Sequence, residues 1–164
     1  MSGLERGRIL TNAARIIREN LEELSQNEVL DNGKPIWEAR MDMETVISNL
    51  EFYGGVAPSI YGQHAKLPNG SFAMITKEPL GVVGGVGAWN YPLQTATWKI
   101  APALACGNTF VYKPSPLTPL SVIMLAEVRN FLEFLISRLN IGKLRHGKLQ
   151  TFQLSKNSQM SDVG

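Results

Sequence analysis

The sequence predicts an α/β fold in which a helical hairpin precedes a single βαβ unit. Apolar residues recur every three or four positions in two stretches near the start of the chain, which is the spacing of amphipathic helices. Two short runs rich in valine and aromatic residues, 81–86 and 109–112, flank a third helical stretch. Strand, helix and strand at this spacing predict a βαβ unit, with two parallel strands and a right-handed crossover.

The composition is that of one ordinary globular domain. The chain has 164 residues, 44% of them hydrophobic, and a net charge of +2 from 16 basic and 14 acidic residues. This balance gives no reason to expect a nucleic acid or an anionic membrane as partner. No apolar run approaches the roughly 18 to 20 residues that span a bilayer, and the first residues lack the apolar stretch of a signal peptide. A single cysteine fits a reducing compartment, so we expect a cytoplasmic protein.

Two amphipathic helices are expected first. Apolar positions repeat with helical spacing over residues 9–24, and Asn32-Gly33 with Pro35 supplies a stop signal. Glycine tolerates the left-handed cap of a helix, whereas proline cannot continue one. A second stripe covers residues 39–53. We expect the two helices to pack as a hairpin.

The middle of the chain carries the strand signals. The Asn-Gly pair at 69–70 indicates a turn, and residues 71–77 have room for an edge strand or arm. The run GVVGGVG at 81–87 is typical of a buried strand that enters a glycine-rich turn. Pro92 suits the first position of a helix, which we expect to continue over residues 93–105.

The composition changes near residue 128. All nine prolines and all three tryptophans precede it, while residues 129–164 hold six basic residues against two acidic ones. Helical spacing extends from 118 to 139 across this break. From Gly142 onward the sequence is polar and has no period, which is typical of disorder. We therefore divide the chain into a domain at 1–128 and a divergent basic tail at 129–164, first helical and then disordered.

The glycine cluster does not match the common phosphate-binding motifs. Asn90 stands where the third glycine of G-x-G-x-x-G would follow Gly85 and Gly87. No Gly-Lys-Ser or Gly-Lys-Thr follows either, which excludes a Walker loop. By themselves the glycines indicate a tight turn between strand and helix, without a ligand.

Four motifs in order and spacing nevertheless resemble the aldehyde dehydrogenase superfamily. They are PLGVV at 79–83, GAWNYP at 87–92, APALACGN at 101–108 and KPSP at 113–116. The helical region that contains NGKP is also similar to the helices preceding this segment in the family, so the resemblance covers about residues 3–128. The WNYP and KPSP forms are most similar to the branch that oxidises trimethylaminobutyraldehyde and related aminoaldehydes.

The resemblance implies a partial NAD-binding, Rossmann-like domain and NAD-dependent oxidation of an aldehyde to the carboxylic acid in a homo-oligomeric enzyme. It gives Asn90 a catalytic role: its amide donates to the oxygen that gains negative charge when a cysteine attacks the aldehyde. The residues alone favour another interpretation. Asparagine is a preferred helix cap, and Asn90 precedes the helix expected near Pro92.

The cofactor-binding residues implied by the resemblance are Lys113, Trp89, Gly87 and Ser115, with no metal. Lys113 would donate to the ribose hydroxyls, although a lysine at a strand end is more often simply solvated. Trp89 and Gly87 would line the cofactor channel, although a tryptophan in a short strand-helix unit is more often part of the core. Many family members have a glutamate at the position of Pro116, and proline cannot accept a hydrogen bond from the ribose.

The family's nucleophilic cysteine and glutamate base come later than the matched region. Cys106 is not a candidate, because it lies near a helix end where the family has a buried structural cysteine. We therefore expect an amino-terminal fragment that is inactive alone. Two alternatives stay open: a nucleotide-binding or subunit-interaction module that uses the arm at 71–77, or a non-functional truncated product, since two parallel strands cannot cover both faces of a sheet.

Overall fold

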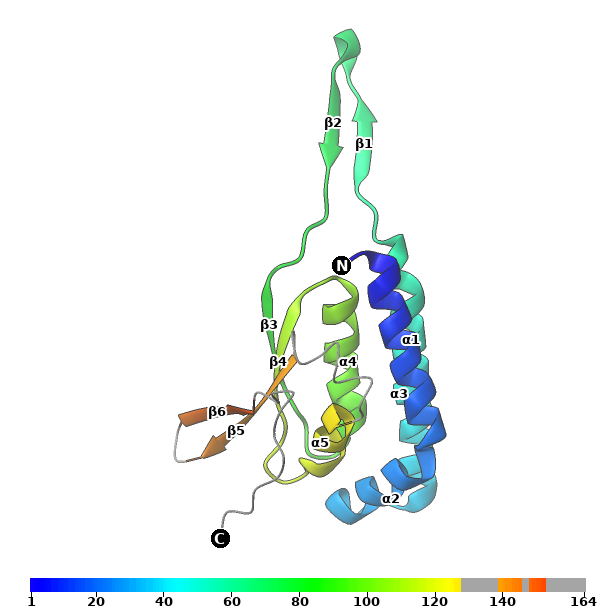
Figure 1. The fold of residues 1–164 in the computed structure, drawn as a ribbon, viewed down its shortest axis with the longest axis vertical. Helices are drawn as coiled ribbons and strands as arrows, with labels where there is room; N and C mark the ends of the chain where they lie inside the picture. Colours follow the sequence, from blue (N-terminus) through cyan, green and yellow to red (C-terminus); the bar gives the residue numbers. More distant parts are fainter. Residues whose placement is uncertain (128–138, 146–147, 153–164) are drawn as a thin grey trace.

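The computed structural model describes residues 1–127, 139–145 and 148–152. It shows the expected mixture of helices and a largely parallel sheet (Figure 1). The elements follow in the order α1 (Gly3–Glu19), α2 (Leu21–Asn32), α3 (Ile36–Val56), η1 (Ala57–Ser59), β1 (Gln63–Lys66), η2 (Pro68–Gly70), β2 (Phe72–Ile75), β3 (Val82–Val86), α4 (Pro92–Ala105), β4 (Thr109–Lys113), α5 (Leu120–Glu127), β5 (Leu139–Arg145) and β6 (Lys148–Phe152).

The first predicted helix is divided in two. Asn20 has φ −112° and ψ 19°, outside helical values, and separates α1 from α2. Its side-chain amide donates to the carbonyl of Ile16 at 2.8 Å, so it ends α1 by satisfying a terminal carbonyl. The apolar spacing did not reveal the break, because both segments are helical on either side of one residue. Gly33 ends α2 with φ 81°, as the stop signal predicted.

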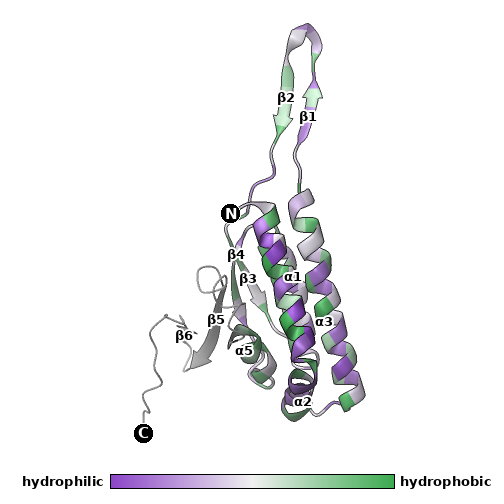
Figure 2. Cartoon of the chain, turned by 45° about the vertical axis from the view of Figure 1, so that its right-hand side comes forward, coloured by the Kyte–Doolittle hydropathy of each residue, from purple (hydrophilic) through white to green (hydrophobic). Residues whose placement is uncertain are grey.

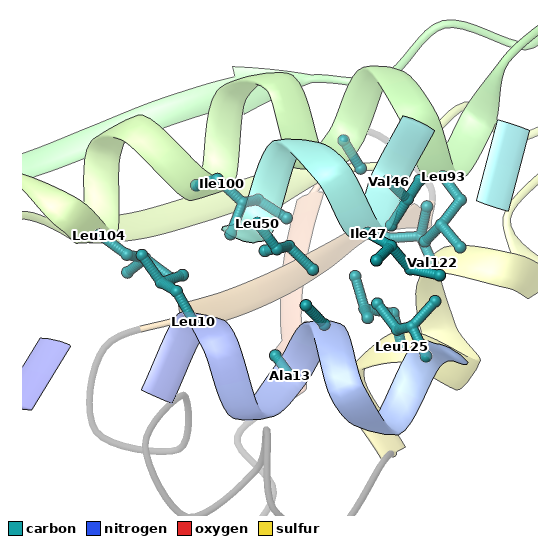
Figure 3. Close-up of a cluster of buried hydrophobic side chains, with 14 of the residues drawn as sticks. Leu10, Ala13, Val46, Ile47, Leu50, Leu93, Ile100, Leu104, Val122 and Leu125 are labelled. Carbon is teal, nitrogen blue, oxygen red and sulfur yellow. The ribbon is translucent and has the colours of Figure 1, made fainter. Parts of the chain in front are cut away.

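Helices α1 and α3 run side by side, which confirms the predicted hairpin (Figure 1). Hydrophilic and hydrophobic residues recur along both helices, as amphipathic helices require (Figure 2). Their apolar sides meet α4 and α5 in one core. Figure 3 shows the side chains that converge there: Leu10, Ala13, Val46, Ile47, Leu50, Leu93, Ile100, Leu104, Val122 and Leu125.

The predicted βαβ unit is confirmed by strands β3 and β4, which pair in parallel and are joined by α4. Val83 of β3 is paired with Phe110 of β4. Phe110 and Tyr112 are buried and belong to the core that α4 shares. On the opposite face Val82 is 74% exposed. Among the described residues, helices therefore cover one face of these two strands and leave Val82 uncovered.

The tail differs from the prediction. The polar sequence from Gly142 was expected to be disordered, yet β5 pairs in parallel with β4 and β6 pairs antiparallel to β5. The edge of β4 carries backbone N–H and C=O groups that a neighbouring strand can satisfy whatever its side-chain period. The helix predicted between 128 and 138 and the end of the tail at 153–164 lie outside the described residues. The division of the chain at 128 stays a prediction.

The predicted arm is one strand of a hairpin. Strands β1 and β2 pair antiparallel, with Gln63 opposite Ile75, and the hairpin projects beyond the helices (Figure 1). Asn69 has φ 61° and Gly70 has φ 77°, which confirms the predicted turn. Strand β1 was missed in the sequence, because its four residues are all exposed and lack an apolar alternation.

Candidate functional site

Two of the predicted site residues meet where the parallel strands end. Gly87 follows β3, and its N–H donates at 2.8 Å to the carbonyl of Lys113, the last residue of β4. In open α/β sheets, ligands bind outside the carboxyl ends of the strands. The fold therefore brings Gly87 and Lys113 to the edge where a dinucleotide is expected.

The chain after β4 crosses directly over Gly87. A Cβ atom there would lie 2.6 Å from the hydroxyl of Tyr112 and 3.1 Å from Pro114 Cα and Ser115 N, so any larger residue would require this turn to shift. Ser115 is buried, and its hydroxyl oxygen accepts from the N–H of Leu117 at 3.2 Å. Ser115 thus shapes this turn, while its hydroxyl hydrogen remains able to donate.

Lys113 has a half-buried side chain at this edge. Its Nζ donates to the carbonyl of Pro114 at 3.3 Å, and within residues 1–127 no carboxylate forms an ion pair with it. An ammonium has three hydrogens. Only one of them has an acceptor among the described residues, so the other two remain able to donate to a neutral acceptor such as a hydroxyl.

Trp89 and Asn90 form an exposed turn between β3 and α4, and both of their backbone carbonyls are hydrogen-bonded. The carbonyl of Trp89 accepts from Asn32 Nδ2 at 2.7 Å and from Thr118 Oγ1 at 2.9 Å. The carbonyl of Asn90 accepts from the same Asn32 Nδ2 at 3.1 Å. The indole of Trp89 is 59% exposed and so is not part of the core.

The side-chain amide of Asn90 does not cap the following helix. The N-cap position of α4 belongs to Tyr91, no side chain makes a capping hydrogen bond there, and Pro92 occupies the first turn as predicted. Within the described part of the chain, the Asn90 amide has no hydrogen-bond partner. Among these residues, nothing competes with a ligand oxygen for the hydrogens of this amide.

Tyr91 connects this turn to a buried charge cluster that the sequence did not reveal. Its hydroxyl donates to Glu38 Oε1 at 2.7 Å, and the Nζ of Lys34 lies 4.2 Å from its ring centroid. Hydrogen bonding to the Glu38 carboxylate raises the pKa of Tyr91. Lys34 is itself buried between Asp42, with which it forms a hydrogen bond, and Glu28 at 3.4 Å. Burial raises the pKa of both acids, against the opposing effect of Lys34.

Cys106 lies at the opposite end of α4 from Asn90. A helix of that length separates its two ends by roughly 20 Å, so Cys106 is not near the site. The side chain is exposed, which corrects the expectation of a buried structural cysteine. The chain reverses at Gly107 immediately after α4, and this turn leaves the thiol at the surface.

Neither a metal site nor a membrane span stands out in the part of the chain that the structure describes. No three potential ligands of the His, Cys, Asp and Glu types gather to hold a metal ion there. No helix in that part is both long enough and apolar enough to cross a bilayer.

Comparison with curated proteins gives close matches over most of the chain. The 4-trimethylaminobutyraldehyde dehydrogenase A of Danio rerio is 56% identical over 128 residues, which are 78% of this chain and 25% of that protein. The Sus scrofa enzyme is 58% identical over 127 residues, covering 77% of this chain and 26% of its own length. The chain therefore spans about a quarter of the length of these relatives.

Solved structures agree in fold. A double mutant of betaine aldehyde dehydrogenase from Staphylococcus aureus, in complex with NAD⁺, matches 86% of this chain and 28% of its own, with a TM-score of 0.82 and 37% identity. An aldehyde dehydrogenase described as putative, from Burkholderia cenocepacia, matches 86% of this chain and 29% of its own, with a TM-score of 0.81 and 38% identity. The model of the "Aldehyde dehydrogenase family" matches residues 1–132. By sequence and by fold, the chain belongs to the aldehyde dehydrogenase family.

Proposed function

We propose that this chain supplies part of the active site for NAD-dependent oxidation of an aminoaldehyde, such as 4-trimethylaminobutyraldehyde, to the carboxylic acid. The names of its relatives support the substrate class, and the NAD⁺ bound to its structural neighbour supports the cofactor. The nucleophilic cysteine and the glutamate base belong to parts of the family outside the matched region. The single cysteine of this chain favours a cytoplasmic location.

The free amide of Asn90 is the observation that carries this proposal. When a thiolate adds to an aldehyde, the carbonyl oxygen gains negative charge that the ground state lacks. A neutral amide held where this charge develops lowers the barrier, because it binds the transition state more tightly than the substrate. Two observations support this role: Asn32 holds the backbone of Asn90, and the side-chain amide of Asn90 has no partner among the described residues.

The cofactor contacts are assigned to the same edge of the sheet. Bound NAD supplies the acceptor for the hydride. We assign Lys113 to the ribose hydroxyls, Trp89 and Gly87 to the wall of the cofactor channel, and Ser115 to the turn beneath it. Pro116 has no carboxylate, so Lys113 is expected to carry more of the ribose recognition here than where a glutamate shares it.

Two substitutions test these roles in a complete enzyme that carries this segment. Asn90→Ala should lower kcat by about 10²- to 10³-fold, or about 2.7 to 4 kcal/mol, with little change in the KM for NAD. Lys113→Ala should raise the KM for NAD with a smaller effect on kcat. Lys66→Ala on β1, remote from the strand ends, is the matched control. An unchanged kcat with a lower melting temperature in Asn90→Ala would support a structural role and contradict the proposal.

A second candidate function is subunit association through the hairpin β1–β2. The hairpin projects from the body (Figure 1), and its strand β2 carries Phe72, Met74 and Ile75, all of them exposed. Phe72 and Met74 lie on the same side of the strand, and exposed apolar side chains that gather on one side of an element mark an interaction site. We therefore propose that the hairpin joins copies of this chain in a homo-oligomer.

A further inference from the structure

We propose that Asn32 is a positioning residue, whose side-chain amide holds the turn at residues 89–91 and thereby the amide of Asn90. The inference rests on the proposed role of Asn90 and extends it to a residue of α2 with no chemistry of its own. Nothing in the stop signal Asn32-Gly33 pointed to such a role, since it marks only the end of a helix.

The geometry is that of a two-point clamp. The single nitrogen Nδ2 of Asn32 donates to two consecutive backbone carbonyls, those of Trp89 at 2.7 Å and Asn90 at 3.1 Å. An amide NH₂ group has two hydrogens, one for each acceptor. The two carbonyls flank the Cα of Asn90, so fixing both restricts rotation of the backbone that carries its side chain.

Asn32 is itself well placed to act as an anchor. It is the last residue of α2, and the preceding Asp31 accepts from the N–H of Leu120 at 2.8 Å through Oδ2. This contact joins the end of α2 to the start of α5. Thr118, just before α5, donates to the carbonyl of Trp89 at 2.9 Å. The turn at residues 89–91 is therefore held by the end of α2 and by the residues just before α5, and these two segments are also hydrogen-bonded to each other.

The clamp on Asn90 itself depends on Asn32 alone. Thr118 reaches only Trp89, while Glu38 and Lys34 contact the Tyr91 side chain. Among the described residues, no other side chain bonds to the backbone of Asn90. An oxyanion donor works because it is already oriented before charge develops. Removing the Asn32 side chain should therefore lower kcat, because Asn90 is less well oriented, and should leave the binding of NAD unchanged.

The first test measures order in the 164-residue chain itself. Backbone ¹⁵N order parameters at residues 89–91 should fall from about 0.85, typical of rigid backbone, toward 0.6 in Asn32→Ala. Asn27→Ala is the matched control, because this asparagine lies on the same helix and donates within it to the carbonyl of Glu23 at 2.9 Å. The control should leave residues 89–91 rigid. Equal order in Asn32→Ala and the unaltered chain would overturn the proposal.

The second test is a double-mutant cycle in a complete enzyme that carries this segment. Asn32→Ala should lower kcat about 10-fold, less than loss of the donor itself, and leave the KM for NAD unchanged. In an Asn90→Ala background it should have no further effect. If Asn32→Ala lowers kcat equally in the unaltered enzyme and in the Asn90→Ala variant, Asn32 does not act through Asn90 and the inference is overturned. Should Asn90→Ala leave kcat unchanged, the proposed function fails, while the order parameters still decide whether Asn32 holds the turn.

Discussion

At the residue scale, the buried cluster of Lys34, Glu28 and Asp42 is the least expected feature. One cation faces two acids, and all three side chains are at least nine-tenths buried. Two buried negative charges facing one buried positive charge are costly, because the single ammonium cannot balance both carboxylates. The two acids therefore hold their protons more tightly than they would in water. Lys34 also lies against the ring of Tyr91, next to the proposed oxyanion donor Asn90.

This cluster should make stability depend on pH. Burial raises the pKa of Glu28 above its ordinary 4.5 and that of Asp42 above its ordinary 3.8. The folded chain therefore holds these protons more tightly than the unfolded chain. Their stabilising contribution is complete below the ordinary values and is lost as the pH rises through the folded pKa of each acid.

Glu28→Gln should flatten that dependence, because the amide keeps the shape of the side chain and cannot ionise. The free energy of unfolding, measured with urea between about pH 5 and about pH 8, should fall less with rising pH than in the unaltered chain. Glu23→Gln, an exposed change on the same helix, should leave the slope as it was. Identical slopes for Glu28→Gln and the unaltered chain would contradict this account.

At the element scale, the local signals predicted the helix ends well where one residue decides them. Gly33 ends α2 because its φ of 81° is open to glycine, and Pro92 begins α4 because its ring already has a helical φ. The true start of α1 was missed. Ser2 and Glu5 form a capping box there, but the apolar stripe that defined the predicted helix begins only at residue 9.

Two glycine substitutions should change stability in opposite directions. Gly33→Ala forces a side chain into the left-handed region and should lower the free energy of unfolding by about 1 to 2 kcal/mol. Gly55 lies inside α3 on an exposed face, with nothing near the Cβ that Gly55→Ala would add. This variant should raise the free energy of unfolding by roughly 0.5 to 1 kcal/mol. Urea unfolding of the two variants and the unaltered chain measures both changes. A stabilised Gly33→Ala would contradict the cap assignment.

At the scale of the whole molecule, the packing is one-sided. The core lies between the helices and one face of the sheet, where Phe110 and Tyr112 are buried. On the other face Val82 and Val86 are exposed. Helix α4 therefore covers Phe110 on one face of the strands, while Val82 on the other face stays exposed. The projecting hairpin β1–β2 adds a second exposed apolar surface (Figure 1).

The hairpin surface should control association. Phe72→Ser combined with Met74→Ser removes two large apolar side chains on the same side of β2, and should shift the sedimentation coefficient toward that of a monomer. Phe52→Ser, an equally exposed change on α3, is the control and should leave the oligomer intact. Loss of association in the control alone would place the interface on the helices instead.

The sequence by itself determined the α/β class, the parallel pair β3 and β4 and the candidate residues Asn90 and Lys113. Periodicity and turn residues act over a few positions, and the family motifs identify residues one by one. The assignment of Asn90 and Lys113 to catalysis and cofactor binding stays a prediction, which the experiments above address.

Only the tertiary structure decided what holds these residues in place. The clamp from Asn32 to the carbonyls of Trp89 and Asn90 joins positions 57 and 58 residues apart. The buried Lys34 appears in the sequence only as one more polar residue, and the pairing of β5 with β4 involves residues without an apolar period. Such contacts form between elements whose relative placement is set by packing of the whole core, and no local pattern records them.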